Sequence, residues 1–157
     1  MSNFSNKTNA REFSFKFIYK ILNSDTDLIT LINTKSPKDD YERLFEEFTA
    51  SYTEPDTEHP NNQINGNAKN FSLTLIEGVL GNKDALEDKI SPKLHKRKIN
   101  QLEKIDYTIL MLGTFEILNV SDTPKAVVID EMVNLAKKFG TAESYSFING
   151  TLDSIKK

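Results

Sequence analysis

Residues that could perform nucleophilic, acid/base or metal chemistry are few in this chain, and they are scattered. Cysteine is absent, so a disulfide framework and a thiolate metal site are both excluded. His59 and His95 are the only histidines, whereas a zinc site ordinarily needs three or four converging nitrogen or sulfur ligands. None of the motifs GxSxG, HExxH and GxxxxGKS/T is present. The residues predict no catalytic site, no metal and no cofactor, and they favour a binding protein.

Charge is distributed unevenly along the chain, and its pattern bears on the kind of partner. Eight carboxylates between residues 39 and 58 are opposed only by Arg43, so this segment would repel a phosphate backbone. Two basic segments have the opposite balance: Lys7, Arg11, Lys16 and Lys20 near the start, and Lys93, Lys96, Arg97, Lys98 and Lys104 further on. Because the net charge is −3, any contact with nucleic acid must be local. Two solvated helix faces are the alternative interpretation of these basic segments.

Helical periodicity dominates the apolar pattern, and the alternation typical of strands is scarce. The segment 99–118 is apolar almost all round after Asp106, which predicts a central, buried helix. Pro124 is expected at the first position of the next helix, and Gly140 is expected to end it with a glycine stop. The expected helices span residues 9–23, 39–52, 68–90 with a break at Gly81 and Asn82, 99–118, 124–140, and a last segment from 141–143 to 155.

The 157 residues are long enough for one domain with its own core, and we find no internal repeat. Residues 53–67 are rich in Pro, Asn and Gly, so they are expected to form a flexible loop within the single domain 1–157. No apolar run has the length of a signal sequence or of a membrane span. We therefore expect a soluble cytoplasmic protein that does not bind membranes.

Four segments carry specific information beyond helical periodicity. The segment PKAVVIDEMVNLAKKFG at residues 124–140, followed by SYSFINGTLD at 144–153, resembles the NusB family, whose pattern is VxINExVxLAKxFG, a serine and then FV/INGxLD. The segment IDYTILMLGTFEIL at 105–118 looks like the family's DRxILRxAxYEL helix, and AREF at 10–13 with Ile18 and Tyr19 looks like its AREx…LY opening. Phe71, Leu75, Gly78 and Val79 fit the family's intermediate helix. These pieces occur in the family's order along a chain of the family's length.

The resemblance implies an all-α, NusB-like fold of two small packed helical bundles in a bacterial protein that catalyses no reaction. It also implies transcription antitermination, most simply of ribosomal RNA operons, through binding of boxA-type single-stranded RNA. The implied protein partner is NusE, a ribosomal small-subunit protein, within an RNA polymerase antitermination complex. The RNA-binding positions carried over from the family are Lys7, Arg11, Glu143, Ser144 and Phe147, and the NusE-binding positions are Tyr19 and Asp106.

The residues themselves leave alternatives open at three of these positions. Without the resemblance, Phe147 is read as a core residue, Tyr19 as a helix-packing tyrosine, and Asp106 as a carboxylate favoured by the dipole at a helix start. An exposed Phe147 would instead stack on an unpaired base, while Lys7 and Arg11 would neutralise phosphates.

This chain also departs from the family pattern. Lys7 and Arg11 stand where relatives often have several arginines, and Tyr107 and Met111 replace arginines of the central helix. We therefore expect weak, salt-dependent RNA binding that needs NusE. The segment 96–98 is either a second basic patch or a solvated loop. The competing functions are a helical interaction module without RNA binding and a domain related to the NusB-like domains of RNA cytosine methyltransferases.

Overall fold

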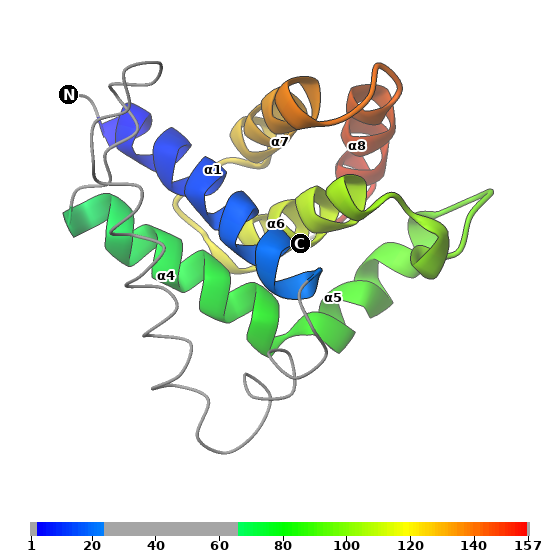
Figure 1. Ribbon diagram of the computed structural model, residues 1–157, viewed down its shortest axis with the longest axis horizontal. Coiled ribbons are helices and arrows are strands. Elements are labelled where there is room, and N and C mark those ends of the chain that lie inside the picture. Colours follow the sequence, from blue (N-terminus) through cyan, green and yellow to red (C-terminus); the bar gives the residue numbers. More distant parts are fainter. Residues whose placement is uncertain (1–2, 24–65, 157) are drawn as a thin grey trace. The chain divides into compact units, whose positions relative to one another are not determined.

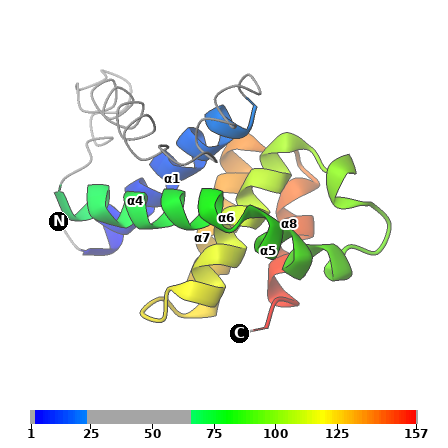
Figure 2. The same cartoon turned by 90° about the horizontal axis from the view of Figure 1, so that it is seen from below.

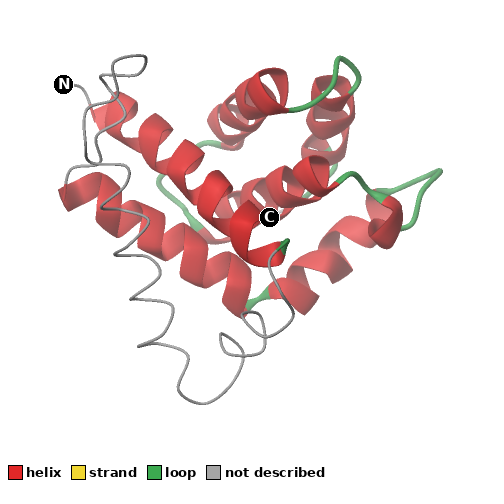
Figure 3. Cartoon of the chain, viewed as in Figure 1, coloured by secondary structure: helices red, strands yellow, loops and turns green. Residues whose placement is uncertain are grey.

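The computed structural model describes residues 3–23 and 66–156, and every regular element in these ranges is a helix (Figure 1 and Figure 3). The all-α class expected from the sequence is thereby confirmed. The helix expected over 39–52 and most of the loop expected over 53–67 lie outside the described residues, although Gly66 and Asn67 already belong to a helix. The helices are α1 (Asn3–Leu22), α4 (Gly66–Gly81), α5 (Lys83–Ile90), α6 (Lys104–Asn119), α7 (Lys125–Phe139) and α8 (Ser144–Asp153), with 3₁₀ turns at Ser91–Lys93 and Ile99–Gln101.

The chain divides into two compact units, Met1–Glu77 and Gly78–Lys157. In the first unit, α1 lies beside α4, and small side chains let the two helices approach closely. Ser72 Oγ donates a hydrogen bond to the carbonyl of Ala10 at 3.2 Å, and Ser14 Oγ donates to the carbonyl of Ser72 at 3.5 Å. Phe13 and Phe17, both buried, stack with their ring centroids 6.4 Å apart. Buried hydroxyls that bond to backbone carbonyls thus join the helices where larger side chains would separate them.

The second unit is built around α6, which contacts α5, α7 and α8 (Figure 2). All residues of α6 from 108 to 117 are buried, which confirms the prediction of a central, buried helix. Two glycines are required by close packing in this unit. A methyl group at Gly113 would lie 2.9 Å from Leu152 Cδ1 and from Met132 Cγ, and one at Gly78 would occupy the space of the Phe115 ring. Either glycine allows a neighbouring side chain to fill the volume beside its backbone.

Several helix boundaries differ from those expected. The first helix begins at Asn3, six residues before the expected start, and α6 begins at Lys104 because Leu102 and Glu103 are extended, with ψ of 146° and 142°. Pro124 precedes α7 as its cap with ψ of 144°, so Lys125 is the first helical residue.

Gly140 ends α7, as expected, and its φ of −94° shows that this stop does not use the left-handed conformation. A side chain there would instead collide with Ser144 and with the carbonyl of Ala136, each 2.8 Å from the Cβ position. The glycine provides space for the turn into α8. Among the described helices, none is both long and apolar enough to cross a membrane.

Candidate nucleic-acid interface

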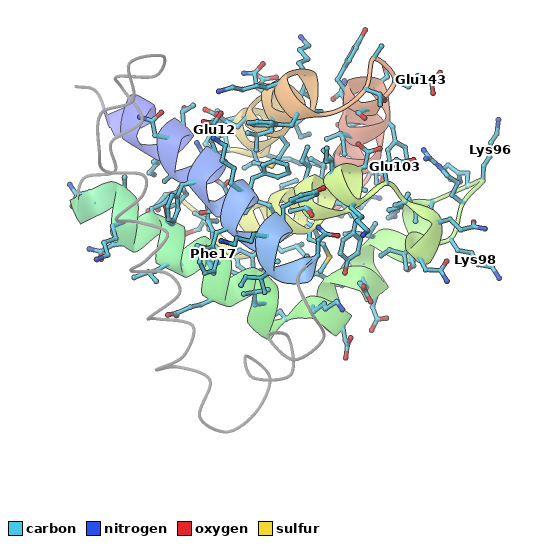
Figure 4. All side chains as sticks on the ribbon, viewed as in Figure 1. Glu12, Phe17, Lys96, Lys98, Glu103 and Glu143 are labelled. Carbon is cyan, nitrogen blue, oxygen red and sulfur yellow. The ribbon has the colours of Figure 1, made fainter. Side chains whose placement is uncertain are left out.

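The start of α8 is held in place by a small polar cluster. Ser144 is only 3% exposed, and its hydroxyl accepts a hydrogen bond from the backbone N–H of Thr141 at 3.0 Å and lies 3.1 Å from the Thr141 hydroxyl. Its side chain also packs against Gly140. Glu143, in contrast, is exposed at the residue that precedes the helix (Figure 4). Of these two predicted RNA-binding residues, Ser144 is therefore engaged within the turn, and Glu143 is accessible.

The other end of α8 is secured by a lysine from the start of α7. Lys125 Nζ donates hydrogen bonds to the carbonyls of Asp153 and Ile155 at 2.7 and 2.6 Å. Carbonyls at a helix C-terminus have no partner within the helix, and a positive charge there also complements the helix dipole. Both ends of this ten-residue helix are thus fixed by side chains of the second unit.

Phe147 projects from α8 toward the segment that joins α5 to α6. The ring is half-buried, and the guanidinium of Arg97 lies over it with Cζ 4.4 Å from the ring centroid. This distance is well within the roughly 6 Å that a cation–π contact requires. The second basic segment of the sequence therefore meets the aromatic residue that the family resemblance placed at the RNA surface. Phe147 is therefore neither a fully buried core residue nor an isolated exposed ring.

A pocket with a volume of about 460 Å³ lies between this segment and α8. Lys96 lines it but Lys98 does not, and the two side chains extend in different directions from the segment (Figure 4). None of the described residues that line the pocket is acidic. The lining residues are Lys93, Leu94, His95, Lys96, Arg97, Ser146, Phe147, Gly150, Thr151 and Ser154.

In the first unit, the two predicted cations near the start of the chain lie beside the same aromatic ring. Lys7 Nζ and Arg11 Cζ each lie 5.3 Å from the centroid of Phe71. Lys7 is half-buried, whereas Arg11 is 1% exposed. The structure therefore brings the two predicted cations together, but only Lys7 has appreciable access to solvent.

Tyr19 and Asp106, the two positions carried over for a protein partner, belong to different units. The Tyr19 ring lies 6.1 Å from that of Phe15 at an angle of 33°. Asp106, in the first turn of α6, is 5% exposed, and its Oδ1 has no hydrogen-bond partner among the described residues. A buried polar atom without a partner is costly. Because this oxygen is itself buried, a donor from another molecule would reach it only if the neighbouring side chains moved.

Sequence reasoning missed several residues around these sites. Tyr107 donates a hydrogen bond to Glu87 Oε1, which links α6 to α5. Burial, and next the hydrogen bond to Glu87 and the charges of Glu87 and Asp84, raise the pKa of the Tyr107 hydroxyl above its ordinary value.

The lining of the pocket was also missed, although one signal was present in the sequence. Ser146, Gly150 and Ser154 recur at a spacing of four, which puts Ser146 and Gly150 on one face of α8 and Ser154 just past its end. No group of three potential metal ligands occurs among the described residues.

Comparison with known proteins agrees with this architecture. Residues 8–157 match the family model described as the NusB family. The transcription antitermination protein NusB of Macrococcus caseolyticus is 35% identical over 151 residues, which cover 96% of each chain. That of Staphylococcus aureus is 47% identical over 87 residues, or 55% of this chain and 67% of the relative.

Solved structures show the same fold. The structure of T. maritima NusB has a TM-score of 0.70 at 28% identity and covers 95% of this chain and 89% of that one. A structure of the antitermination factors NusB and NusE in complex with dsRNA has a TM-score of 0.69 at 19% identity, with coverage of 99% and 97%, a likeness that shows the fold alone. With the family model spanning nearly the whole chain and a full-length relative above 30% identity, this chain belongs to the NusB family.

Proposed function

We propose that this chain is a transcription antitermination factor that binds boxA-type single-stranded RNA together with NusE and catalyses no reaction. Its place would be the bacterial cytoplasm, in an antitermination complex with RNA polymerase, with ribosomal RNA operons as the expected targets. Family membership supports this function, because the curated relatives are transcription antitermination proteins. A solved neighbour with the same fold contains NusB, NusE and dsRNA.

The observation that carries the RNA-binding part is the environment of Phe147. An aromatic ring that is partly accessible, with Arg97 over it and further cations beside it, can hold an unstacked base and its phosphate at once. Glu143, exposed at the start of the same helix, is placed to accept a hydrogen bond from a base or a ribose hydroxyl. Ser144 acts as a positioning residue, since its hydroxyl is engaged with Thr141.

At the other predicted RNA-binding segment, the two cations have different roles. Lys7 contacts phosphate, because it retains solvent access. Arg11 positions the opening of α1 through its contact with Phe71, because its side chain is buried. The burial of Arg11 also favours a second candidate function, a helical interaction module that binds NusE but little RNA.

For NusE, the proposed contacts are Tyr19 and Asp106. The Oδ1 atom of Asp106 has no partner among the described residues but is buried, so it would accept a hydrogen bond from NusE only after the neighbouring side chains move. Replacement by asparagine keeps the shape of the side chain and avoids burying a lysine. We expect Asp106→Asn to weaken the complex by about 1 kcal/mol or more, as measured by calorimetry, whereas Asp130→Asn, a change at an exposed carboxylate of α7, leaves it unchanged.

The deciding experiment is a titration of a labelled, boxA-like single-stranded RNA with the full chain, with and without NusE, at several salt concentrations. We expect weak binding by the chain alone and much tighter binding when NusE is present. A ternary complex no tighter than either binary one would reject the proposal. Binding of NusE without any RNA binding would establish the interaction module instead.

A further inference from the structure

The pocket between residues 93–97 and α8 has the size and the charge of a ligand site. Its volume of about 460 Å³ falls within the roughly 300–1,000 Å³ that is usual for small-molecule sites. Lys93, Lys96 and Arg97 contribute three permanent cations to its lining, and no described lining residue offsets them. Cations gathered around one concave surface create a positive potential there, which attracts an anion. The ligand expected here is therefore negatively charged.

Gly150 leaves the backbone of α8 uncovered at the pocket. Glycine in the middle of a helix costs about 1 kcal/mol relative to alanine, so its presence needs a reason. The described residues contain no glycine with positive φ, and a Cβ at Gly150 would meet no atom within 4 Å. Packing within the protein thus explains Gly78 and Gly113 but not Gly150. Since Gly150 lines the pocket, the missing side chain leaves the backbone of α8 open to the pocket.

The pair formed by Arg97 and Phe147 indicates that part of the ligand is flat. The guanidinium is exposed, and the ring beneath it holds its Cζ at 4.4 Å. Nucleic-acid bases stack on aromatic rings and on arginine planes, and such stacking needs a base that is free of its helix. The Ser146 hydroxyl on the same side of α8 can donate to or accept from a ribose hydroxyl.

We propose that this pocket holds one nucleotide of single-stranded RNA, with the phosphate at Lys93 and Lys96 and the base stacked at the Arg97 and Phe147 pair. The proposal rests on the RNA-binding function proposed above and adds to it a site formed by residues 93–97 and the open backbone at Gly150. An acidic peptide would also neutralise the cations, but it would use neither the stacking pair of Arg97 and Phe147 nor the uncovered backbone at Gly150.

The first test fills the pocket without disturbing the fold. Gly150→Leu puts a side chain into open space, and Gly81→Leu makes the same change at an exposed helical glycine that also has no atom within 4 Å of its Cβ position and does not line the pocket. In the presence of NusE, Gly150→Leu should lower the affinity for boxA-like RNA about tenfold or more, which corresponds to about 1.4 kcal/mol. Gly81→Leu should bind as the wild type does, and neither variant should unfold at a lower denaturant concentration.

The second test removes single charges from the segment. Lys96→Ala should reduce the slope of log K against log salt by about 0.7, the value for one phosphate contact on a single strand. Lys98→Ala changes the net charge equally, but Lys98 does not line the pocket. The salt slope of RNA binding by this variant should therefore equal that of the wild type. Equal effects of the two substitutions would mean that the segment acts only as a diffuse positive field.

The outcomes separate this inference from the proposed function. If RNA still binds in a NusE-dependent manner and both Gly150→Leu and Lys96→Ala retain wild-type affinity, the nucleotide site is wrong and the function stands. If Gly150→Leu lowers affinity for a polyglutamate peptide but not for RNA, the pocket binds acidic peptides and the inference is overturned. If the wild-type chain binds no RNA even with NusE, both proposals fail.

Discussion

Phe71 and Phe147 both lie beneath cations, and the two clusters that they form differ in their exposure. In the first unit, Lys7 and Arg11 lie over Phe71, and Arg11 is 1% exposed. In the second unit, Arg97 lies over Phe147 and is exposed at the edge of a pocket. The same pair of residue types thus contributes to the interior in one unit and to a surface in the other. Burial, more than residue type, determines which cations are available to a ligand.

The local sequence explains this difference. Arg11 lies in α1 between Ala10 and Phe13, which are fully buried, so the helix carries its side chain inward. Arg97 lies between two short 3₁₀ turns, and the residues from His95 to Lys98 are all exposed. A buried guanidinium loses its hydration, and its removal also leaves a large void.

The largest expected effect is on stability in the first cluster. Arg11→Ala should lower the free energy of unfolding by about 2–5 kcal/mol, the range for loss of a large buried side chain. Arg97→Ala should change it by no more than about 1 kcal/mol, the value of an exposed cation–π contact. Denaturant unfolding of both variants measures the contrast. Wild-type stability of Arg11→Ala together with a loss of RNA affinity would show that Arg11 is an RNA ligand.

The second expected effect is on affinity in the second cluster. Phe147→Ala should weaken RNA binding by about 1–3 kcal/mol through loss of stacking, while the salt slope remains unchanged. Phe71→Ala removes the ring beneath Lys7 and Arg11, so it should reduce stability more than affinity. RNA titration and thermal unfolding of the two variants give the four values needed. Equal losses of affinity would show that the clusters do not differ in function.

A smaller effect is expected at the accessible cation of the first cluster. Lys7→Ala should reduce the salt slope of RNA binding by about 0.7. The matched control is Lys16→Ala on the same helix, where the ammonium lies 3.6 Å from Glu12 in an i, i+4 ion pair. This control should leave the slope unaltered and cost about 0.3–0.5 kcal/mol of stability. A slope that changes equally in both variants would remove the special role of Lys7.

The last expected effect concerns the anchoring of the segment that carries Arg97. Tyr107→Phe removes the hydrogen bond to Glu87, which links the two helices joined by that segment, and should cost about 0.5–1.5 kcal/mol at neutral pH. The pKa of the Tyr107 hydroxyl is raised by folding, so the neutral form is favoured in the folded protein. The resulting stability is complete below the ordinary tyrosine pKa of about 10 and declines as the pH rises above it.

This alkaline dependence provides a second measurement for the same variant. The wild type should lose more of its unfolding free energy than Tyr107→Phe does when the pH is raised from 8 to about 10.5, just above the ordinary tyrosine pKa. Parallel losses in the two proteins would show that other groups dominate the alkaline range.

Periodicity predicted the helices well, because burial on one side imposes a spacing of three and four residues on apolar side chains. It failed at the start of α6, where Ile99 and Leu102 continue the spacing although the backbone at Leu102 is extended. Periodicity also missed the polar beginning of α1, because residues that are not apolar carry no such signal.

The candidate site was less accessible to prediction from the sequence. Family resemblance identified Phe147, but the contact with Arg97 joins residues fifty positions apart, and no local pattern reports such a contact. The burial of Arg11 contradicts the usual exposure of arginine. Nor does the sequence reveal which helical glycines make room for a neighbouring side chain and which, as at Gly150, face open space.

The bonds from Lys125 to the carbonyls of Asp153 and Ile155 bear on the kinetics of recognition. A helix as short as α8 is marginal by itself in water. Ser144 fixes one end of α8 and Lys125 fixes the other, so the side of α8 that lines the pocket is already ordered before a ligand binds. Binding therefore carries no entropic cost for ordering this helix. The observed rate constant for binding to this pocket should therefore rise in proportion to ligand concentration, without a plateau set by a conformational step.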